Sequence, residues 1–403
     1  MNVRKKSEMS EIQNANFTLP ESWRWVRLRE VCSIYPGQHI LESDYNRGRV
    51  GVGYLTGPAD FGETYPSVTK WTERPKAWCE PGDVLVTVKG AGVGKSNLAP
   101  NEQVAIGRQL MAIRPKPELM EQRFLYYVVI IHFSKLQAKS VGSTVPGLGR
   151  KDIETLEISL PPFHEQKRIA AKIQELMQEV ERARTACEKQ LDAAKALPAA
   201  YLRGVFESEE AKKWERKKLG EVCEVVTGNT PSRNFPENYG AYIPWIKPED
   251  LDREMYVSYS KEHLSELGVT RSRSLPAGAV LVSCIGNLGK TAIAGCKLAT
   301  NQQINSLIPS PQINSEYLYF CCHTLQETLE ILASSTTLKI VNKSIFASIE
   351  IPLPPLSVQQ RIATELKEKM AQVEKLRTSI EKQLEALNAL PQAILRKAFR
   401  GEL

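Results

Sequence analysis

The stretch LPPFHEQKRIA, residues 160–170, returns with few changes as LPPLSVQQRIA, residues 353–363. A second stretch, EKQLDAAKALP at residues 188–198, returns as EKQLEALNALP at residues 381–391. The offset is the same for both pairs, 193 residues, since 353 − 160 equals 381 − 188. A strong internal repeat fixes the architecture before any single motif is interpreted. We conclude that one unit of roughly half the chain has been duplicated.

The segments between these stretches repeat more weakly, and gaps are needed to align them. Most residues between the landmarks differ, so the two halves share a scaffold and diverge in detail. We interpret them as two recognition units of the same build that read different targets. The matched landmarks are Trp23 with Trp214, Glu30-Val31-Cys32 with Glu221-Val222-Cys223, Gly37 with Gly228, Val84-Leu85-Val86 with Val280-Leu281-Val282, Gly94-Lys95 with Gly289-Lys290, and Arg108-Gln109 with Gln302-Gln303.

Composition places the chain among globular proteins with room for two or three domains. It has 403 residues, of which 42% are hydrophobic and 25% are charged. No apolar run reaches the length of a membrane span, and the polar residues 1–16 do not read as a secretory signal. The eight cysteines include no CxxC pair, so we expect free thiols in a reducing cytoplasm. The net charge of +7 permits a polyanionic partner without requiring one.

The repeated stretches carry the apolar pattern of long helices. Apolar residues recur in steps of 4, 4, 3, 3, 4, 4 and 3 in both copies, a period between 3.5 and 3.6. Prolines at 161–162 and 354–355 block helix upstream, and Pro198 and Pro391 are expected to interrupt it downstream. We therefore expect two helices of roughly 33 residues, each about 50 Å long. The apolar positions are Ile169, Ile173, Met177, Val180, Ala183, Cys187, Leu191 and Ala194, and Ile362, Leu366, Met370, Val373, Leu376, Ile380, Leu384 and Leu387.

Two arrangements of these helices are open: each caps its own globular segment, or the two pair with each other. The first seam has small residues where the second has large ones, which is typical of two unlike helices packed together. If the halves are related by an approximate two-fold axis, the paired helices are antiparallel and the globular segments lie at opposite ends of a rod. We favour pairing, through Ile169, Ile173, Met177, Val180, Ile362, Leu366, Met370, Val373, Leu376 and Ile380.

The globular segments mix short β-like runs with loops. Strands are predicted at 84–88, 280–283 and 292–293, and helices at 121–139 and 315–333. The predicted fold class is α+β, with two similar globular domains joined by two long antiparallel helices in a coiled coil with a pseudo-two-fold repeat. The predicted parts are a flexible N-terminal arm (1–19), a first globular domain (20–160), a central helical spacer (161–212), a second globular domain (213–353) and a C-terminal helical spacer (354–403).

Two stretches that look like catalytic motifs depart from them at a necessary residue. Residues 90–96, GAGVGKS, look like a nucleotide phosphate loop, but Lys89 stands where that motif needs glycine, as Cys284 does in the second copy. Leu160 opens a stretch similar to the Asn/Asp-Pro-Pro-aromatic motif of amino-methyltransferases, yet leucine cannot accept a hydrogen bond from a target amino group. The histidines are scattered without metal-ligand spacing. We expect neither catalytic residues nor a metal site.

Basic and amide side chains collect in the predicted loops of both halves. Arginine can bridge guanine edges, asparagine or glutamine can bridge adenine edges, and lysine mainly meets phosphate. Recurrence at matched turns, notably Lys95 with Lys290 and Gln109 with Gln303, favours nucleic-acid contact over ordinary surface positions. The predicted DNA-binding residues are Lys89, Lys95, Arg108, Gln109, Lys247, Arg271, Arg273, Lys290, Asn301, Gln302, Gln303, Lys339 and Lys343, with Arg47, Arg49, Lys70 and Asn342 in the same loops.

The repeat resembles the specificity subunits of type I restriction-modification systems. The two Leu-Pro-Pro-x-x-x-Gln-x-Arg-Ile starts (from 160 and 353) and the two Ala-Leu-Pro-x-Ala-x-Leu-Arg ends (from 196 and 389) carry the resemblance. The stretch at 301–304, Asn-Gln-Gln-Ile, is also typical of the family. The first copy departs from it with Gly-Arg-Gln at 107–109, and Val358 stands where the family usually has glutamate.

The resemblance implies that each globular domain is a target-recognition domain reading one half of a split sequence in double-stranded DNA. The helices would set the number of unread base pairs between the halves and dock two modification (methyltransferase) subunits. Those subunits would carry the catalytic residues and S-adenosylmethionine, and restriction subunits would join the complex. The chain itself would be non-catalytic and would hold no cofactor, with ATP and Mg also on partner subunits.

Two other classes of function stay open at this point. A cryptic enzyme that binds nucleotide through Lys95 or Lys290 would lose ATP binding when either lysine is replaced by alanine. A coiled-coil adaptor that binds only protein would lack sequence-specific DNA binding even with its partners present. Two unlike globular domains on a rod of fixed length favour the DNA-reading subunit over both.

Overall fold

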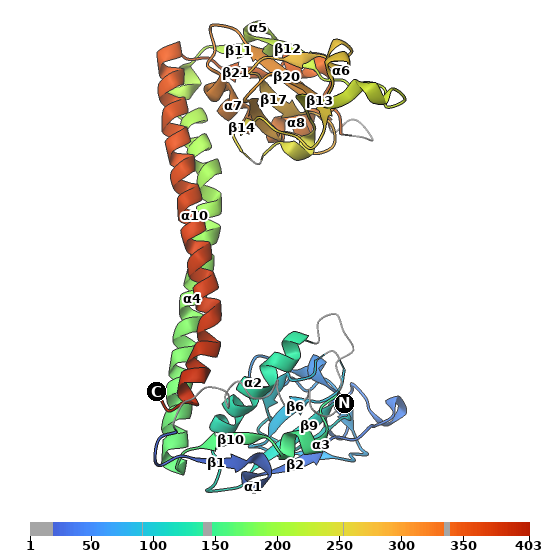
Figure 1. Cartoon of the computed structure of the whole chain (residues 1–403), viewed down its shortest axis with the longest axis vertical. Coiled ribbons are helices and arrows are strands. Elements are labelled where there is room, and N and C mark those ends of the chain that lie inside the picture. The colour runs from blue at the N-terminus through green and yellow to red at the C-terminus, as the bar shows by residue number, and fades with distance from the viewer. Residues whose placement is uncertain (1–18, 91, 140–146, 253, 334–338) are drawn as a thin grey trace. The chain divides into compact units, whose positions relative to one another are not determined.

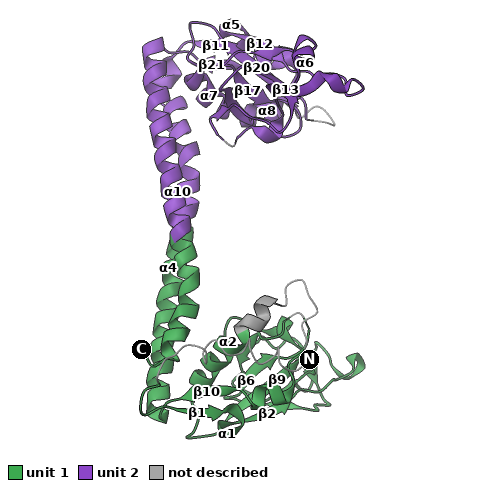
Figure 2. Ribbon diagram, in the orientation of Figure 1, with its two compact units in different colours: residues 1–188, 383–403 green, residues 189–382 purple. Residues whose placement is uncertain are grey.

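The computed structural model describes residues 19–90, 92–139, 147–252, 254–333 and 339–403. The predicted N-terminal arm, residues 1–19, lies outside these ranges except for its last residue. The chain divides into two compact units, which Figure 2 draws in different colours. Unit 1 comprises residues 1–188 and 383–403, and unit 2 comprises residues 189–382. Each unit therefore contains one globular domain and a part of both long helices (Figure 1).

The globular part of unit 1 contains two small sheets, a strand pair and short helices. One sheet has the strand order β2-β9-β6-β7, the other has the order β4-β3-β8-β5, and β1 pairs with β10. The elements are β1 (Arg24–Arg27), α1 (Leu28–Val31), β2 (Cys32–Pro36), η1 (Glu42–Asp44), β3 (Val52–Leu55), η2 (Pro58–Asp60), β4 (Trp71–Thr72), β5 (Trp78–Cys79), β6 (Val84–Thr87), β7 (Ser96–Leu98), β8 (Val104–Ile106), β9 (Leu110–Pro115), α2 (Gln122–Lys139), α3 (Arg150–Glu154) and β10 (Glu157–Leu160).

The globular part of unit 2 repeats this plan. Its sheets have the orders β12-β20-β17-β18-β14 and β15-β13-β19-β16, and β11 pairs with β21. The elements are η3 (Ala211–Lys213), β11 (Arg216–Lys218), α5 (Leu219–Val222), β12 (Cys223–Thr227), η4 (Pro236–Asn238), β13 (Tyr239–Ile246), η5 (Pro248–Asp250), β14 (Tyr256–Val257), β15 (His263–Leu264), α6 (Glu266–Thr270), β16 (Ser274–Leu275), β17 (Val280–Ser283), β18 (Thr291–Ala294), β19 (Leu298–Thr300), β20 (Ile304–Pro309), α7 (Ser315–His323), α8 (Gln326–Ala333), α9 (Lys343–Ala347) and β21 (Glu350–Pro352).

The two units match strand for strand, with β14 as an addition at one sheet edge of unit 2. The predicted strands at 84–88, 280–283 and 292–293 are confirmed as β6, β17 and β18. The predicted helix at 121–139 is confirmed as α2, whereas the one at 315–333 is divided into α7 and α8 at residues 324–325. The mixed α and β content predicted for each globular segment is therefore present in both units.

The central strand β6 shows why its sequence is apolar throughout. Val84, Leu85 and Val86 are all fully buried. Val84 and Val86 pack into a core with α2, whereas Leu85 packs on the opposite side against the second sheet. Successive side chains of a strand face opposite sides of its sheet, so a strand between two cores has no polar face. Residues 280–282 of β17 divide between two cores of unit 2 in the same way.

The two long helices extend further than the sequence predicts. α4 spans Phe163–Phe206, 44 residues, and α10 spans Leu356–Ala398, 43 residues. Pro198 lies inside α4 and Pro391 inside α10, so the prediction that these prolines interrupt the helices is wrong. Proline in a helix interior costs about 3 kcal/mol because it lacks an N–H and its ring crowds the preceding turn. The turns beyond each proline must therefore be stabilised by other contacts.

Aromatic packing beyond the prolines supplies that stabilisation. Phe206, the last residue of α4, has its ring centroid 5.7 Å from that of Tyr317 in unit 2. Phe399, next after the last residue of α10, lies 5.2 Å from Phe124 in unit 1 and is buried. Burying one large apolar side chain contributes roughly 1.5–3 kcal/mol, which is comparable to the cost of the proline. The end of α4 thus completes the core of unit 2, and the end of the chain completes the core of unit 1.

Within unit 1, the first part of α4 and the last part of α10 run antiparallel. Arg168 Nη2 donates to the carbonyl of Leu403 at 3.1 Å. Further along α4, Cys187 Sγ lies 3.9 Å from Gln383 Oε1. Residue numbers rise along one helix while they fall along the other, which defines the antiparallel direction in this unit.

Most of the predicted helix-pairing residues turn away from solvent. Met177, Val180 and Met370 are half-buried. Ile169 and Ile173 pack into the core of unit 1, and Ile362 and Leu366 pack into that of unit 2, so their burial is shared with the globular domains. The predicted positions that are fully buried are Ile169, Ile173, Ile362, Leu366, Val373 and Ile380.

Leu376 contradicts the predicted seam, because 45% of its surface is exposed. Its counterpart in the first copy, Ala183, is also exposed. The predicted pattern places two successive steps of three residues here, whereas alternating steps of three and four keep side chains on one face of a paired helix. Such steps lead from Val373 to Arg377 and then to Ile380, and the Nε atom of Arg377 is shielded from solvent. The heptad position between Val373 and Ile380 is therefore taken by an arginine whose side chain is 37% exposed and whose Nη1 donates to Glu374 at 3.1 Å.

The repeated glutamine of the first copy joins α4 to its globular domain. Gln166 is buried, and its Oε1 accepts the backbone N–H of Glu121, just before α2, at 2.8 Å. Its Nε2 donates to the carbonyls of Leu119 and Pro161, both at 3.0 Å. Every polar atom of the side-chain amide is thus paired, as burial requires.

Gln359 makes the same three contacts in unit 2. Its Oε1 accepts the N–H of Asn314 at 2.9 Å, and its Nε2 donates to the carbonyls of Gln312 at 3.1 Å and Pro354 at 2.8 Å. The conspicuous glutamine of the repeated motif is therefore a structural residue in both copies.

Candidate nucleic-acid interface

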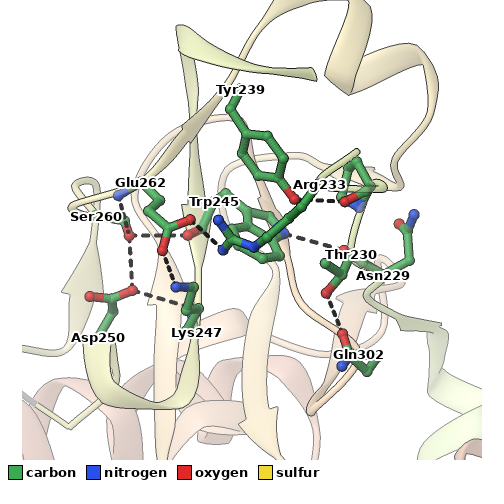
Figure 3. Close-up of polar contacts among 11 residues, drawn as sticks. Asn229, Thr230, Arg233, Tyr239, Trp245, Lys247, Asp250, Ser260, Glu262 and Gln302 are labelled. Carbon is green, nitrogen blue, oxygen red and sulfur yellow. Dashed lines mark hydrogen bonds and ion pairs between the residues drawn. The ribbon is translucent and has the colours of Figure 1, made fainter. Parts of the chain in front are cut away.

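A polar cluster lies at the end of β13 in unit 2 (Figure 3). Trp245, near the end of this strand, is buried, and its indole Nε1 donates to the carbonyl of Asn229 at 3.2 Å. Its backbone N–H donates to the carbonyl of Glu262 at 3.0 Å. This strand pairing brings Glu262 beside Lys247, the residue that follows β13.

Glu262 binds two cations at once. Lys247 Nζ donates to its Oε1, and Arg233 Nη2 donates to its Oε2 at 2.8 Å. The hydrogen bond from Lys247 is the largest cause holding the pKa of Glu262 below its ordinary value. Partial burial opposes that shift, and the hydrogen bond from Arg233 adds to it. Figure 3 shows all three charged groups gathered around the ring of Trp245.

Two predicted arginines converge on the loop that holds Asn229. Arg273 Nη1 donates to the carbonyl of Thr227 at 2.6 Å, and its backbone N–H donates to Asn229 Oδ1 at 3.1 Å. Arg271 Nη1 donates to Asn238 Oδ1 at 2.9 Å, and its carbonyl accepts from Asn229 Nδ2 at 2.9 Å. Both arginines are exposed. Arg271 and Arg273 therefore hold the loop of Asn229, and Lys247 lies against the ring of Trp245, whose indole binds the same loop.

The turn between β19 and β20 separates the three predicted amide residues. Asn301 is buried, and its side chain accepts from the N–H of Gln303 at 3.1 Å and donates to Gln303 Oε1 at 2.8 Å. The amide of Asn301 therefore closes the turn from inside, and its contact with DNA stays a prediction. Gln302 is exposed, and its Oε1 accepts from Thr230 Oγ1. This hydrogen bond ties Gln302 to the loop that carries Asn229 and Thr230.

A second group of predicted residues lies along the segment after β17. The backbone N–H of Cys284 donates to the carbonyl of Gln303 at 2.8 Å, and that of Gly286 donates to the carbonyl of Lys339 at 3.0 Å. Lys343 is exposed at the start of α9. Lys290 is half-buried in the β17–β18 connection, where its backbone pairs with Ser283. Gln303, Lys339 and Lys343 are thus brought together, with Lys290 in the neighbouring turn.

Unit 1 uses the same backbone positions with different side chains. The N–H of Tyr54 donates to the carbonyl of Lys70 at 2.8 Å, as Trp245 does to Glu262, so Lys70 occupies the position of the carboxylate. Lys70 Nζ donates to Thr56 Oγ1 at 3.2 Å. Asp60 is buried and accepts from the N–H of Thr56 at 2.6 Å. The structure therefore assigns Lys70 to the central cluster of this domain.

Lys89, Lys95, Arg108 and Gln109 lie around the β6–β7 and β8–β9 turns, whereas Arg47 and Arg49 lie between η1 and β3. Lys89, Lys95 and Arg108 are exposed. Gln109 is half-buried, because its Oε1 fills the space where a Cβ on Gly57 would lie, 2.0 Å from it. Gln109 therefore packs against its own domain, while the three cations face solvent.

Sequence reasoning missed three residues of these surfaces. Arg233 and Glu262 complete the cluster at Trp245, and Arg150 of α3 is the counterpart of Lys343 of α9. The register of the β13–β15 pair would have identified Glu262, because the carbonyl of Glu262 accepts the backbone N–H of Trp245. Arg233 has no basic counterpart in the repeat, because the first copy holds Glu42 at the same spacing from the matched Gly37 and Gly228.

The glycine turn at residues 90–96 is a hairpin connection without the geometry of a phosphate loop. A strand, β7, follows it instead of a helix. The N–H of Gly94 donates to the carbonyl of Thr87 at 2.9 Å, and the N–H of Lys95 donates to the carbonyl of Gly92 at 3.0 Å. A phosphate loop needs such N–H groups free to point at the ligand. These contacts do not favour nucleotide binding at Lys95.

The chemistry of the described side chains gives little support to other sites. All eight cysteines are free thiols, and burial raises the pKa of Cys32 and Cys79 to about 12, which keeps them protonated. Among the described residues, no group of three His, Cys, Asp or Glu side chains is placed to hold a metal ion. Within that same part of the chain, every helix is too short or too polar to span a membrane.

The chain is similar to proteins of one family. The family described as type I restriction modification DNA specificity domain matches twice, at residues 20–187 and 211–387. The MjaIX specificity subunit of Methanocaldococcus jannaschii is 36% identical over 161 residues, which are 38% of this chain and 37% of that protein. The EcoBI specificity subunit of Escherichia coli is 22% identical over 436 aligned positions, covering 100% of this chain and 90% of that one.

A solved structure extends this likeness to the fold. A chain from work on complex assembly and conformational transition of the type I R-M system superposes with a TM-score of 0.75 at 26% identity. The match covers 96% of this chain and 100% of that one. The chain therefore shares its two-unit build with a protein of such a system, although the first relative matches over little more than a third of its length.

Proposed function

The chain belongs to the type I restriction modification DNA specificity family, and we propose that it is the non-catalytic subunit that selects the DNA sequence for such a system. Each globular domain reads one half of a bipartite, asymmetric target in double-stranded DNA. Residues 20–160 form the first target-recognition domain and residues 213–353 the second.

The observation that supports this most strongly is one scaffold with two different polar surfaces. Apart from β14, the strand orders match in the two units, and so do the buried glutamine joints, yet the matched positions beside β3 and β13 carry Lys70 in one and Glu262 in the other. Base readout requires particular donors and acceptors at the edge of a domain, so two domains that differ there read unlike half-sites. A scaffold that served only protein docking would have no need to reverse a charge at this position.

We further propose that α4 and α10 pair as a coiled coil of fixed length and so set the number of unread base pairs between the half-sites. Two domains spaced by about one turn of DNA, roughly 34–36 Å, can face the same side of the duplex. The outer faces of these helices dock two methyltransferase subunits, which carry the catalytic residues and S-adenosylmethionine. Restriction subunits then join, and ATP and Mg act on the partner subunits.

The test is methylome sequencing of a host that expresses the full chain with its methyltransferase subunit, compared with the methyltransferase alone. We expect a new bipartite motif, two unlike short halves around a fixed gap, only when the chain is present. Exchanging residues 213–353 for those of another family member should change one half of the motif and leave the other. Unchanged methylation despite co-purification of the subunits would favour the protein-binding adaptor instead.

The proposal that the length of α4 and α10 sets the gap between the half-sites has its own test in the same assay. Removing seven residues from α4 and the facing seven from α10 keeps the heptad phase of both helices. We expect the gap to shorten while both half-sites stay the same. A variant complex that methylates altered half-sites with an unchanged gap would contradict the proposal that helix length sets the gap.

A further inference from the structure

Arg233 is the most exposed member of the cluster around Trp245, and its position is fixed by its surroundings. Its side chain is 59% exposed, while that of Lys247 is only 21% exposed. The guanidinium lies 5.0 Å from the ring centroid of Tyr239 and 5.7 Å from that of Trp245. Glu262 holds one end of the guanidinium at 2.8 Å. A planar cation that is stacked and held at one end presents its other N–H groups in one direction.

The loop that carries Arg233 is itself held on both sides. Tyr239 Oη donates to the carbonyl of Pro231 at 2.6 Å, and Asn238 Nδ2 donates to the carbonyl of Ser232 at 2.9 Å. The indole of Trp245 holds Asn229, four residues earlier, as described above. Figure 3 shows Arg233 crossing the face of this tryptophan. The loop therefore fixes the backbone from which the guanidinium extends.

The charge of the cluster distinguishes the two things that an arginine can bind on DNA. Arg233 and Lys247 contribute two positive charges, and Glu262 and Asp250 contribute two negative ones, with Asp250 accepting from the N–H of Lys247 at 3.1 Å. Phosphate binding draws on net positive charge and the release of counterions. Arg271 and Arg273, both exposed and bound to the same loop, supply that charge, whereas Arg233 is paired with Glu262. The O6 and N7 atoms of guanine need only two N–H donors in one plane.

We propose that Arg233 reads a guanine in the half-site recognised by unit 2, donating to its O6 and N7 atoms, and that Glu262 is a positioning residue that aims it. This inference rests on the proposed function and names a determinant of its specificity. At the backbone position of Glu262, unit 1 carries Lys70, so the pairing of an arginine with this glutamate is confined to unit 2 and its half-site.

The experiment uses the complex of the full chain with its methyltransferase subunits and duplexes that carry the motif found by methylome sequencing. Each guanine of the second half-site is replaced in turn by 7-deazaguanine, which lacks the N7 acceptor. We expect the wild-type complex to lose affinity at one guanine by a part of the roughly 5- to 150-fold discrimination of a bidentate arginine contact, because 7-deazaguanine keeps O6 and loses only N7. Arg233→Ala removes both hydrogen bonds, so it should bind the unmodified duplex more weakly by at least that factor and show no further loss with 7-deazaguanine.

Two further variants separate aiming from charge. Arg233→Lys keeps the charge without the planar fork and should behave like Arg233→Ala at that guanine. Glu262→Gln should reduce the preference for guanine over 7-deazaguanine at the same position, an effect that a purely structural role would not produce. Lys261→Ala removes an exposed charge one residue away and should keep the preference.

The outcomes are distinguishable. A second half-site without guanine, or a 7-deazaguanine response as large in Arg233→Ala as in the wild type, would overturn the assignment of Arg233. Absence of any bipartite motif or sequence-specific binding in the wild-type complex would instead remove the proposed function itself.

Discussion

The joints at Gln166 and Gln359 and the polar clusters beside Lys70 and Glu262 occupy matched places in the two units, but they compare in opposite ways. At the joints, the same side chain makes the same three hydrogen bonds, with distances that agree to within about 0.2 Å. At the clusters, only the backbone contact is kept, and the charge beside it is reversed. The contacts that are repeated atom for atom hold each unit together. The positions where the backbone is kept and the side chains differ are those that we propose to contact DNA.

The largest effect is expected at the joints. Gln359→Leu leaves the N–H of Asn314 and the carbonyls of Gln312 and Pro354 without their side-chain partner, and a buried unsatisfied group costs about 1–3 kcal/mol. Gln312 is exposed, so water can replace the partner of its carbonyl. We expect the free energy of unfolding of unit 2 to fall by about 3–5 kcal/mol, as measured by urea titration. Gln166→Leu should destabilise unit 1 by a similar amount.

The neighbouring residue provides the control for that experiment. Gln360 is exposed beside Gln359, and Gln360→Leu should change the free energy of unfolding by less than about 0.5 kcal/mol. If the two leucine variants were equally stable, the joint would be dispensable, and the repeated glutamine would need another explanation.

A smaller effect is expected where the two joints differ. Trp23 Nε1 donates to Glu165 Oε2 at 3.1 Å in unit 1, whereas the matched position in unit 2 holds Val358, which packs with Trp214 against the core. Glu165→Val should therefore destabilise unit 1 by about 1–2 kcal/mol, the net contribution of one hydrogen bond to a charged group.

A double-mutant cycle isolates this hydrogen bond. Trp23→Phe removes the donor, so Glu165→Val should cost little more in that background than Trp23→Phe alone. Additive losses in the cycle would show that Glu165 stabilises the joint through other contacts.

The sequence predicted the shared scaffold because burial leaves a pattern in the chain. The apolar runs at β6 and β17 and the seams of α4 and α10 follow directly from strand and helix periods. The continuation of both helices through Pro198 and Pro391 was not predictable in this way. It depends on Phe206 and Phe399 packing against aromatic rings far away in the sequence.

The recognition surface was only partly predictable, because loop geometry decides it. Asn301 and Gln302 are adjacent in sequence, yet one closes a turn from inside and the other faces solvent. Lys247 was found as a basic loop residue, but its partner Glu262 became visible only through the pairing of β13 and β15. Composition indicates which residue types can meet DNA, and the fold selects among them.

The pH dependence of stability should also differ between the two clusters. The pKa of Glu262 is lowered, chiefly by the hydrogen bond from Lys247, so its stabilising contribution is present above the ordinary pKa of 4.5 and is lost as the pH falls through the folded value. Because about a third of the side chain is exposed, we expect this contribution to be less than about 1 kcal/mol. Glu262→Gln should lower the Tm of unit 2 at pH 7 and make little difference at a pH below the folded pKa of Glu262.

A second carboxylate, Glu249, serves as the control for the pH effect predicted at Glu262. Glu249 is exposed on the turn η5 next to Lys247, and Glu249→Gln removes one negative charge while leaving the contacts of Glu262 intact. The Tm difference between wild type and Glu249→Gln should be smaller at pH 7 than that for Glu262→Gln. Equal differences would mean that general charge, and not the pairing with Lys247 and Arg233, explains the effect.

The smallest effect is expected at Leu376, where the second copy carries a large apolar residue and the first carries Ala183, both exposed. Leu376→Ala makes the copies alike and should change the free energy of unfolding by less than about 0.5 kcal/mol. Ile380, four residues further and buried, provides the contrast, since Ile380→Ala should cost about 2–5 kcal/mol. An exposed leucine on a helix that packs inward elsewhere suits contact with another chain, so Leu376→Ala should instead weaken co-purification with the methyltransferase subunit. Comparable destabilisation by both alanine variants would return Leu376 to the seam between the helices and leave the docking face to other residues.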